Sequence, residues 1–178
     1  VWLVAWLLAS AAGVAVVATA LLGTPPPSAP GMANAGSWPA GIAPLPELSS
    51  LSPDERFARL FDRLMRAGAE WDSATVASLS PLAEQAYAQL DSVDADTRFH
   101  AGLLAIQIGN FPGAHALADT LEARDPGHLF GPILLGALAR LEGDTVGYGQ
   151  ALELFRQRVG GELARTDRPE YVEHQQLL

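Results

Sequence analysis

The sequence predicts an all-α protein in three successive parts: a single N-terminal transmembrane helix at residues 1–23, a Pro-rich extended linker at residues 24–52 and an antiparallel helical-hairpin domain at residues 53–178. Three observations lead to this division. No charged side chain occurs before Glu47, proline is concentrated in the linker, and apolar residues return at helical spacing in the rest of the chain.

The first 23 residues, VWLVAWLLASAAGVAVVATALLG, contain no charge, and Ser10 and Thr19 are their only polar side chains. A helix of this length reaches roughly 35 Å, which is enough to cross a bilayer core of about 30 Å. A cleaved signal peptide is the alternative, but its apolar stretch usually runs only about 7 to 15 residues. We therefore expect a retained anchor that places residues 1–23 in the lipid bilayer.

The flank of this span indicates its orientation. The first basic residue after it is Arg56, and chain free of Lys and Arg is tolerated on the translocated side. We expect a bacterial inner (cytoplasmic) membrane protein whose C-terminal domain is periplasmic.

Within the span, Ala5, Ala9 and Gly13 recur every four residues and form a stripe that lets another transmembrane helix approach. Chance in an Ala-rich segment explains this stripe equally well.

The linker holds seven Pro and three Gly in residues 24–52, and Pro removes the backbone donor that helices and strands need. By composition this segment is an extended spacer. It also carries apolar side chains that suit docking into the grooves of a partner protein. The candidate partner contacts are Trp38, Ile42 and Leu45.

The helical domain begins with a capping signal. Ser52 and Glu55 have the spacing of a capping box, and Pro53 stands at the first helical position, where its missing N–H costs nothing. Apolar residues then follow on one face, and Gly68 is predicted to end the helix. These apolar residues are Phe57, Leu60, Phe61, Leu64 and Met65.

A second helix is predicted to start at Ser80 and Pro81, because Pro favours the first turn. The pattern assigns no structure to residues 71–79. The residues expected on the buried side of this helix are Leu82, Ala86, Leu90 and Val93.

From Asp94 onward the chain matches itself at an offset of 34 residues. The matched pairs are Gly102 with Gly136, Leu104 with Leu138, Ala105 with Ala139, Gly109 with Gly143, Asn110 with Asp144, Arg124 with Arg158 and Gly127 with Gly161. Small residues inside a helix and a turn-forming pair after it let two antiparallel helices pack closely.

These residues resemble the tetratricopeptide repeat, with clearest copies at residues 95–128 and 129–161. The family pattern falls on Gly102, Gly109, Ala114 and Pro126 in the first copy and on Gly136 and Gly143 in the second. The resemblance implies a TPR-like stack of helix pairs that binds proteins, without naming the ligand. The second copy departs from the family at Tyr148 and Gly160, which predicts wider packing or a different helix end.

The C-terminal segment contains a helix start at Asp167, Pro169 and Glu170, followed by apolar residues at Tyr171 and Val172. We expect this tail to cover the last apolar face of the repeat stack. Docking on a neighbouring protein is the alternative.

No pattern of catalytic or metal-binding residues emerges. The four histidines, none of which is three or four residues from another, are His100, His115, His128 and His174. His115 and Asp119 are one helical turn apart and are expected to form a solvated pair. Three nearby acids lack the ligand series of a calcium loop and are expected at helix ends; they are Asp91, Asp94 and Asp96. We predict no enzyme, no cofactor and no metal.

Charge narrows the choice of partners. Eleven Arg, no Lys and a net charge of -9 leave little basic surface for nucleic acid, and no small-molecule substrate is predicted. The expected function is that of a non-catalytic accessory subunit, which scaffolds a bacterial membrane complex by binding its other protein subunits. The Arg-only, Ala-rich composition is typical of high-GC bacteria. Bioenergetic complexes, including photosynthetic reaction-centre and light-harvesting assemblies, are the natural hosts for such a subunit, although no motif identifies one. The alternative is a free-standing envelope TPR protein that binds client polypeptides in cytochrome c maturation or outer-membrane assembly.

Overall fold

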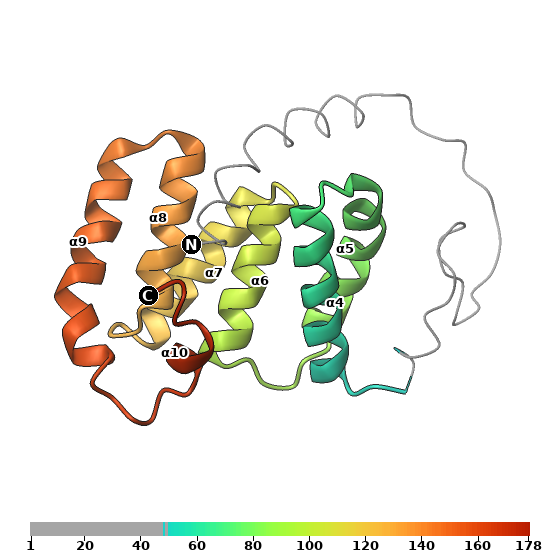
Figure 1. The fold of residues 1–178 in the computed structure, drawn as a ribbon, viewed down its shortest axis with the longest axis horizontal. Coiled ribbons are helices and arrows are strands. Elements are labelled where there is room, and N and C mark those ends of the chain that lie inside the picture. Colours follow the sequence, from blue (N-terminus) through green and yellow to red (C-terminus); the bar gives the residue numbers. More distant parts are fainter. Residues whose placement is uncertain (1–47, 49) are drawn as a thin grey trace.

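The computed structural model describes Leu48 and residues 50–178, and this part of the chain is all-helical (Figure 1). Its helices are α4 (Pro53–Ala69), α5 (Ser73–Ala88), α6 (Ala95–Gln107), α7 (Phe111–Arg124), α8 (Phe130–Glu142), α9 (Thr145–Glu162) and the short α10 (Glu170–Glu173). The first six pack as three antiparallel hairpins, so the prediction of an all-α hairpin domain is confirmed.

Several expectations concern residues outside this range. The span at residues 1–23 and nearly all of the linker are not among the described residues, and neither are the six candidate partner contacts. These contacts are Ala5, Ala9, Gly13, Trp38, Ile42 and Leu45. Among the helices that the structure does describe, none has the length and apolar character needed to cross a bilayer.

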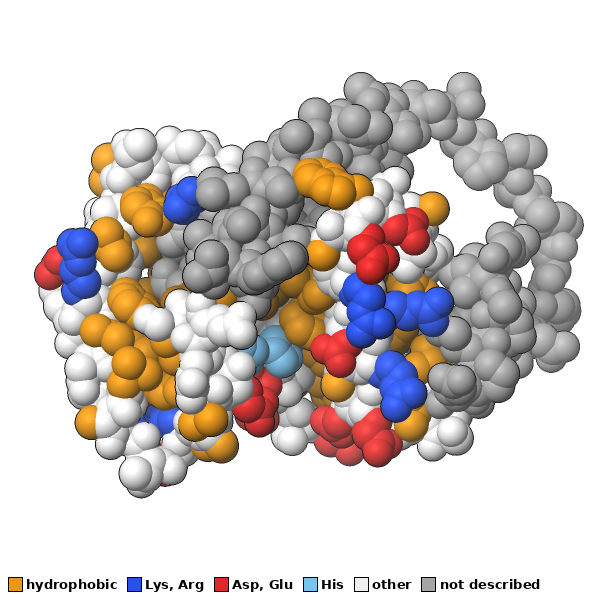
Figure 2. Space-filling model, in the orientation of Figure 1, with side chains coloured by type: hydrophobic (Ala, Val, Ile, Leu, Met, Phe, Trp, Pro, Cys, Tyr) orange, Lys and Arg blue, Asp and Glu red, His pale blue; other side chains and the backbone are white. Residues whose placement is uncertain are grey.

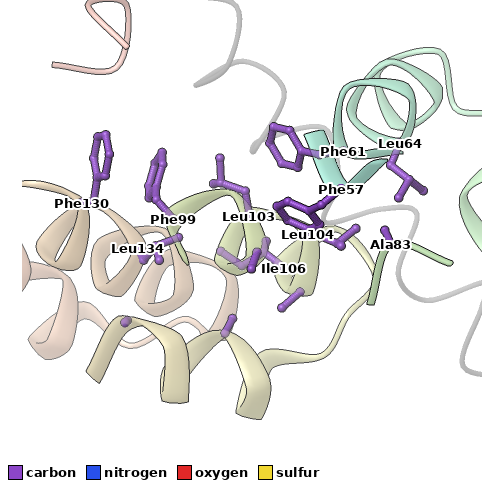
Figure 3. Close-up of a cluster of buried hydrophobic side chains, with 14 of the residues drawn as sticks. Phe57, Phe61, Leu64, Ala83, Phe99, Leu103, Leu104, Ile106, Phe130 and Leu134 are labelled. Carbon is purple, nitrogen blue, oxygen red and sulfur yellow. The ribbon is translucent and has the colours of Figure 1, made fainter. Parts of the chain in front are cut away.

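The first helix of each hairpin forms one row, in which α6 lies between α4 and α8 (Figure 1). A continuous apolar core follows this row. It runs from Phe57 and Leu64 on α4, through Leu104 on α6, to Leu134 on α8 (Figure 3). The hairpins therefore share one hydrophobic core, and each stabilises its neighbour.

The three hairpins turn in the same way. Each turn has one residue with positive φ, followed by a residue that caps the next helix; these pairs are Trp71–Asp72, Gly109–Asn110 and Gly143–Asp144. In each pair the backbone N–H of the second residue donates to the carbonyl five residues earlier, at 2.8 Å. Its side chain accepts hydrogen bonds from the first turn of the following helix. The first hairpin is thus structurally equivalent to the other two.

The likeness of the first hairpin turn to the other two is not detected when the sequence is compared with itself, for two reasons. The offset from Asp72 to Asn110 is 38 residues instead of 34, and Trp71 stands where the later turns have Gly109 and Gly143. The spacing and the residue type both differ, although the backbone path is the same.

The predicted start of the second helix at Ser80 and Pro81 is wrong. Helix α5 begins at Ser73, because the Asp72 carboxylate accepts a hydrogen bond from the backbone of Thr75 at 3.0 Å. Pro81 lies inside the helix, and because proline has no backbone N–H, the carbonyl of Ala77 loses its helical hydrogen bond. Ala77 is exposed, so water can bind this carbonyl instead.

The burial expected for that helix also changes. Ala86 is buried, whereas Leu82 is only partly buried, and Leu90 and Val93 come after the helix has ended. Leu79 and Ala83 are also buried, and they pack into the core.

The first helix begins as predicted and ends slightly later. The Ser52 backbone N–H donates to Glu55 Oε2 at 3.0 Å, and the Glu55 N–H donates to Ser52 Oγ at 3.3 Å, so the capping box is confirmed. Gly68 does not end α4; it lies within the helix, and the chain reverses at Trp71. Glycine is costly inside a helix but does not by itself stop one.

The third hairpin departs from the second at its end. Helix α9 continues through Gly160 and Gly161 to Glu162. Tyr148 is on its outer side, where the Arg140 guanidinium lies 5.7 Å from the ring centre. A large residue at position 148 is therefore accommodated by exposure.

Candidate functional site

The segment after α9 turns back over the domain and brings α10 against α6 and the start of α8 (Figure 1). We call residues 163–178 the tail. It packs within the chain, but not over the outer face of α9, where Val146 remains exposed. An ion pair between Arg168 and Asp125 holds the start of the tail to the α7–α8 loop.

Tyr171 is the buried anchor of the tail, with 5% of its surface exposed. Its hydroxyl donates to Glu162 Oε2 at 2.9 Å and accepts from the backbone N–H of Leu129 at 3.1 Å. Burial and the nearby Glu162 carboxylate raise the pKa of this hydroxyl, so it keeps the proton that it donates. The hydroxyl thereby joins the tail to the ends of α8 and α9.

His128 forms a second link to the tail. Its Nδ1 accepts a hydrogen bond from the Phe130 backbone N–H at 3.1 Å, so the proton lies on Nε2, which donates to Glu170 Oε1 at 3.0 Å. The His128 side chain is fully buried. Both ring nitrogens are therefore used, and this histidine has a structural role.

A cluster of two histidines and one carboxylate lies beside these links. His174 Nε2 is 2.8 Å from Asp96 Oδ1, and His100 Nδ1 is 3.6 Å from Asp96 Oδ2. Each of the three residues offers a donor atom within 4.8 Å of the other two. In the part of the chain that the structure describes, this is the only group of His, Asp and Glu side chains that could share a cation. We call these three residues the His–Asp cluster.

Helix α6 and the tail position the cluster together. Asp96 and His100 are one turn apart on α6, so they share a face of the helix. His174 follows the last residue of α10 and reaches the cluster because the tail has folded back.

Aromatic rings surround the two imidazoles. His100 stacks on Phe61 with ring centres 4.2 Å apart. The ring of His174 is nearly perpendicular to those of Phe99 and Phe130, at 5.6 and 5.2 Å between ring centres, and these two phenyl rings stack on each other. Figure 3 shows both phenyl rings standing on the same side of the helix row. The rings restrict the rotation of the imidazoles and shield them from water.

The electrostatics of the cluster follow from burial and mutual charge. Burial lowers the pKa of His100, although the Asp96 carboxylate opposes this effect. Burial also raises the pKa of Asp96, but the hydrogen bond with His174 and the charges of the histidines outweigh it, so this pKa lies below its usual value. A neutral imidazole beside an ionised carboxylate is the state in which both can act as metal ligands.

The residues predicted to pack the repeats are distributed along the hairpins. Gly102 faces Leu134, and Gly136 faces Ala151. Gly109 and Gly143 have positive φ at their turns. Ala114 is fully buried in α7, and Pro126 lies in the loop that follows α7. None of these six residues belongs to the His–Asp cluster.

The His–Asp cluster was not predicted from the sequence, because Asp96 was assigned to a helix end and His115 was the only histidine paired with an acid. Asp96 and His100 have helical i, i+4 spacing, which was a usable signal. No local pattern pointed to His174, which is 78 residues from Asp96. His115 pairs with Glu142 at 3.0 Å, on the surface, and no bond joins it to Asp119 among the described contacts.

Fold and site together define a small all-helical domain of stacked antiparallel hairpins whose own C-terminal tail is docked against the helix row. Comparison with known proteins adds no relative: no family model matches the sequence, and no curated protein or solved structure matches it.

Proposed function

We propose that this chain is a non-catalytic, single-pass accessory subunit of a bacterial membrane complex, in which the TPR-like domain binds other protein subunits on the periplasmic side. The uncharged 23-residue segment at the N-terminus supports the anchor. Three equivalent hairpins support a binding scaffold, because such stacks present an extended surface. We propose a photosynthetic reaction-centre or light-harvesting complex as the host, and the Arg-only, Ala-rich composition supports the bacterial part of this proposal.

The observation that carries the proposal is the placement of Trp71. Its side chain is 58% exposed, and its φ of 59° lies in the left-handed region, which costs a non-glycine residue about 1–2 kcal/mol. The two equivalent turns have glycine instead. An exposed tryptophan therefore occupies a strained position without burying its ring in the domain, and tryptophan is among the residues that contribute most at protein interfaces.

Other exposed apolar residues lie at the same end of the domain. Val146 and Tyr148 are in the first turn of α9, directly after the third turn, and both are exposed. The three hairpin turns lie along the same edge of the domain, at the ends of the helices that are away from α10 (Figure 1). We propose that Trp71, Val146 and Tyr148 are contacts for the partner subunit.

Purification from detergent-extracted membranes tests this function. A tagged chain is isolated under mild conditions, and intact complexes are weighed by native mass spectrometry. We expect stoichiometric partner subunits with the wild-type chain and a loss of at least tenfold in their recovery with Trp71→Gly. Val172→Ala, a change at an exposed residue of the tail, is the control and retains the partners. Recovery of the wild-type chain alone would contradict the proposal.

One observation favours the second candidate, a free-standing envelope protein that binds client polypeptides. The tail is itself a peptide segment held against α6 and α8 by backbone and side-chain bonds. A client could occupy the same place. Cross-linking tests this candidate. It is favoured over the first if many polypeptides are captured in substoichiometric amounts, and if Tyr171→Phe in the tail abolishes their capture while Trp71→Gly does not.

A further inference from the structure

We propose that the His–Asp cluster is a binding site for a divalent transition-metal cation, with zinc as the best-suited ion. Two imidazoles and one carboxylate are the ligand types that zinc accepts, and three protein ligands leave room for water at a fourth position. The inference concerns the tail side of the domain and is independent of Trp71 and of any partner subunit.

The spacing of the donor atoms is close to that of a coordination sphere. The three donor atoms lie within 4.8 Å of one another. Ligands around a tetrahedral zinc are about 3.4 Å apart, so no pair has to close by more than about 1.4 Å. Asp96 and His100 are already on one face of α6, as two ligands from a single helix require.

The closing movement falls on a part of the chain that can make it. His174 comes directly after a helix of only four residues and belongs to the tail, not to the helix row. Its Nε2–H now donates to Asp96 Oδ1. Coordination through Nε2 moves this proton to Nδ1 and replaces the hydrogen bond with two bonds to the metal, one from each residue.

The cluster is accessible from solvent. The Asp96, His100 and His174 side chains are 27%, 21% and 14% exposed, so they are largely shielded but not sealed. Figure 2 shows histidine at the surface near the centre of this view, with acidic side chains beside it. An ion therefore has a route to the cluster from solvent.

Metal binding would hold the tail in place. Two ligands belong to α6 and the third belongs to the tail, so only the docked tail completes the cluster. A ligand that binds only one of two states lowers the ratio of the other state to it by a factor of 1 plus the free ligand concentration divided by Kd. At a free metal concentration of 100 times Kd, the released tail therefore becomes about 100-fold rarer.

Titration of the whole 178-residue chain in detergent with cobalt and then zinc tests the site. Metal-free protein is expected to take up one Co²⁺ with visible absorption of a four- or five-coordinate ion, and Zn²⁺ displaces it. His100→Ala, His174→Ala and Asp96→Asn should each weaken affinity at least tenfold. Asp96→Asn keeps the shape of the side chain and an oxygen for the hydrogen bond with His174, so its effect reports ligation more than docking.

His115→Ala is the matched control. His115 also has a carboxylate at 3.0 Å, that of Glu142, but no second histidine. This variant should bind metal within twofold of the wild-type chain. Equal affinity of all four variants, or no saturable 1:1 binding by the wild-type chain, would overturn the proposal.

Two readouts on the wild-type chain remain valid even if a variant fails to fold. Zinc should shift the imidazole NMR signals of His100 and His174 and leave those of His115 unchanged. Zinc should also slow chymotryptic cleavage of the wild-type chain after the buried Tyr171 at least tenfold. Shifts that are confined to other histidines, or cleavage that is insensitive to zinc, would contradict the site.

Discussion

The side chain of Leu134 on α8 lies directly against the backbone of Gly102 on α6. A Cβ atom at residue 102 would be 2.5 Å from Leu134 Cδ1 and 3.1 Å from Cδ2. Leu134 is fully buried, so it has no open space into which it can move. The close approach of two neighbouring helices in the row thus depends on the absence of a side chain at Gly102.

Gly102→Ala is therefore expected to destabilise the domain. Overpacking a full core costs about 1–3 kcal/mol. Gly149→Ala is the matched control, because Gly149 is also inside a helix but has nothing within 4 Å of the added methyl group. Both changes gain the same helix propensity, so Gly102→Ala should be less stable than Gly149→Ala by about 1–3 kcal/mol in chemical denaturation. Equal stability would show that α6 and α8 do not approach this closely.

Trp71→Gly is expected to raise the free energy of unfolding by about 1 kcal/mol. The change relieves a left-handed backbone at an exposed side chain, and this gain exceeds the entropy that glycine loses on folding. Thermal unfolding measures the effect. Gly143→Ala is the reverse case, because the φ of Gly143 is 74° and the added methyl group meets nothing within 4 Å. Its free energy of unfolding should fall by about 1 kcal/mol. A loss of stability on Trp71→Gly would mean that the indole contributes to folding.

Tyr171→Phe is expected to loosen the tail. The change removes the partner of the Leu129 backbone N–H and one donor to Glu162, and unsatisfied buried groups cost about 1–3 kcal/mol. Hydrogen exchange at the Leu129 amide and in the tail should accelerate, while exchange in α4 stays unchanged. Val172→Ala, next to it but exposed, should leave both rates unaltered. Unchanged exchange at Leu129 in Tyr171→Phe would contradict this account of the anchor.

The capping box gives a pH dependence. Hydrogen bonds from the backbone and side chain of Ser52 lower the pKa of Glu55 below its usual value of 4.5. A carboxyl group whose pKa is lower in the folded state stabilises that state above pH 4.5, and the contribution disappears as pH falls through the folded-state pKa. Glu55→Gln should therefore be less stable than the wild-type chain at neutral pH, with the difference vanishing in acid.

An NMR titration of the Glu55 carboxyl carbon supplies the direct check. Its midpoint should lie below 4.5 in the wild-type chain and move upward in Ser52→Ala, which removes one of the two hydrogen bonds. A midpoint at or above 4.5 would show that the capping box does not form in solution.

Local interactions explain which elements were predictable. The capping box of α4 depends on residues three apart, and the turns at Gly109 and Gly143 depend on one glycine followed by one capping residue. Such patterns act within a few residues of chain and can be read before any tertiary contact is known. The turn at Trp71 has the same backbone but no glycine, so it was not recognised.

From the sequence alone it was possible to derive an all-α domain of helical hairpins, the cap at Ser52 and the two glycine turns, because short-range hydrogen bonds and apolar spacing decide them. Only the tertiary structure decided that Leu79 and Ala83 are buried on α5 and that His174 meets Asp96. The first depends on how α5 packs into the shared core. The second joins residues 78 apart, and their meeting requires the stacking of the hairpins and the return of the tail, which no local pattern encodes.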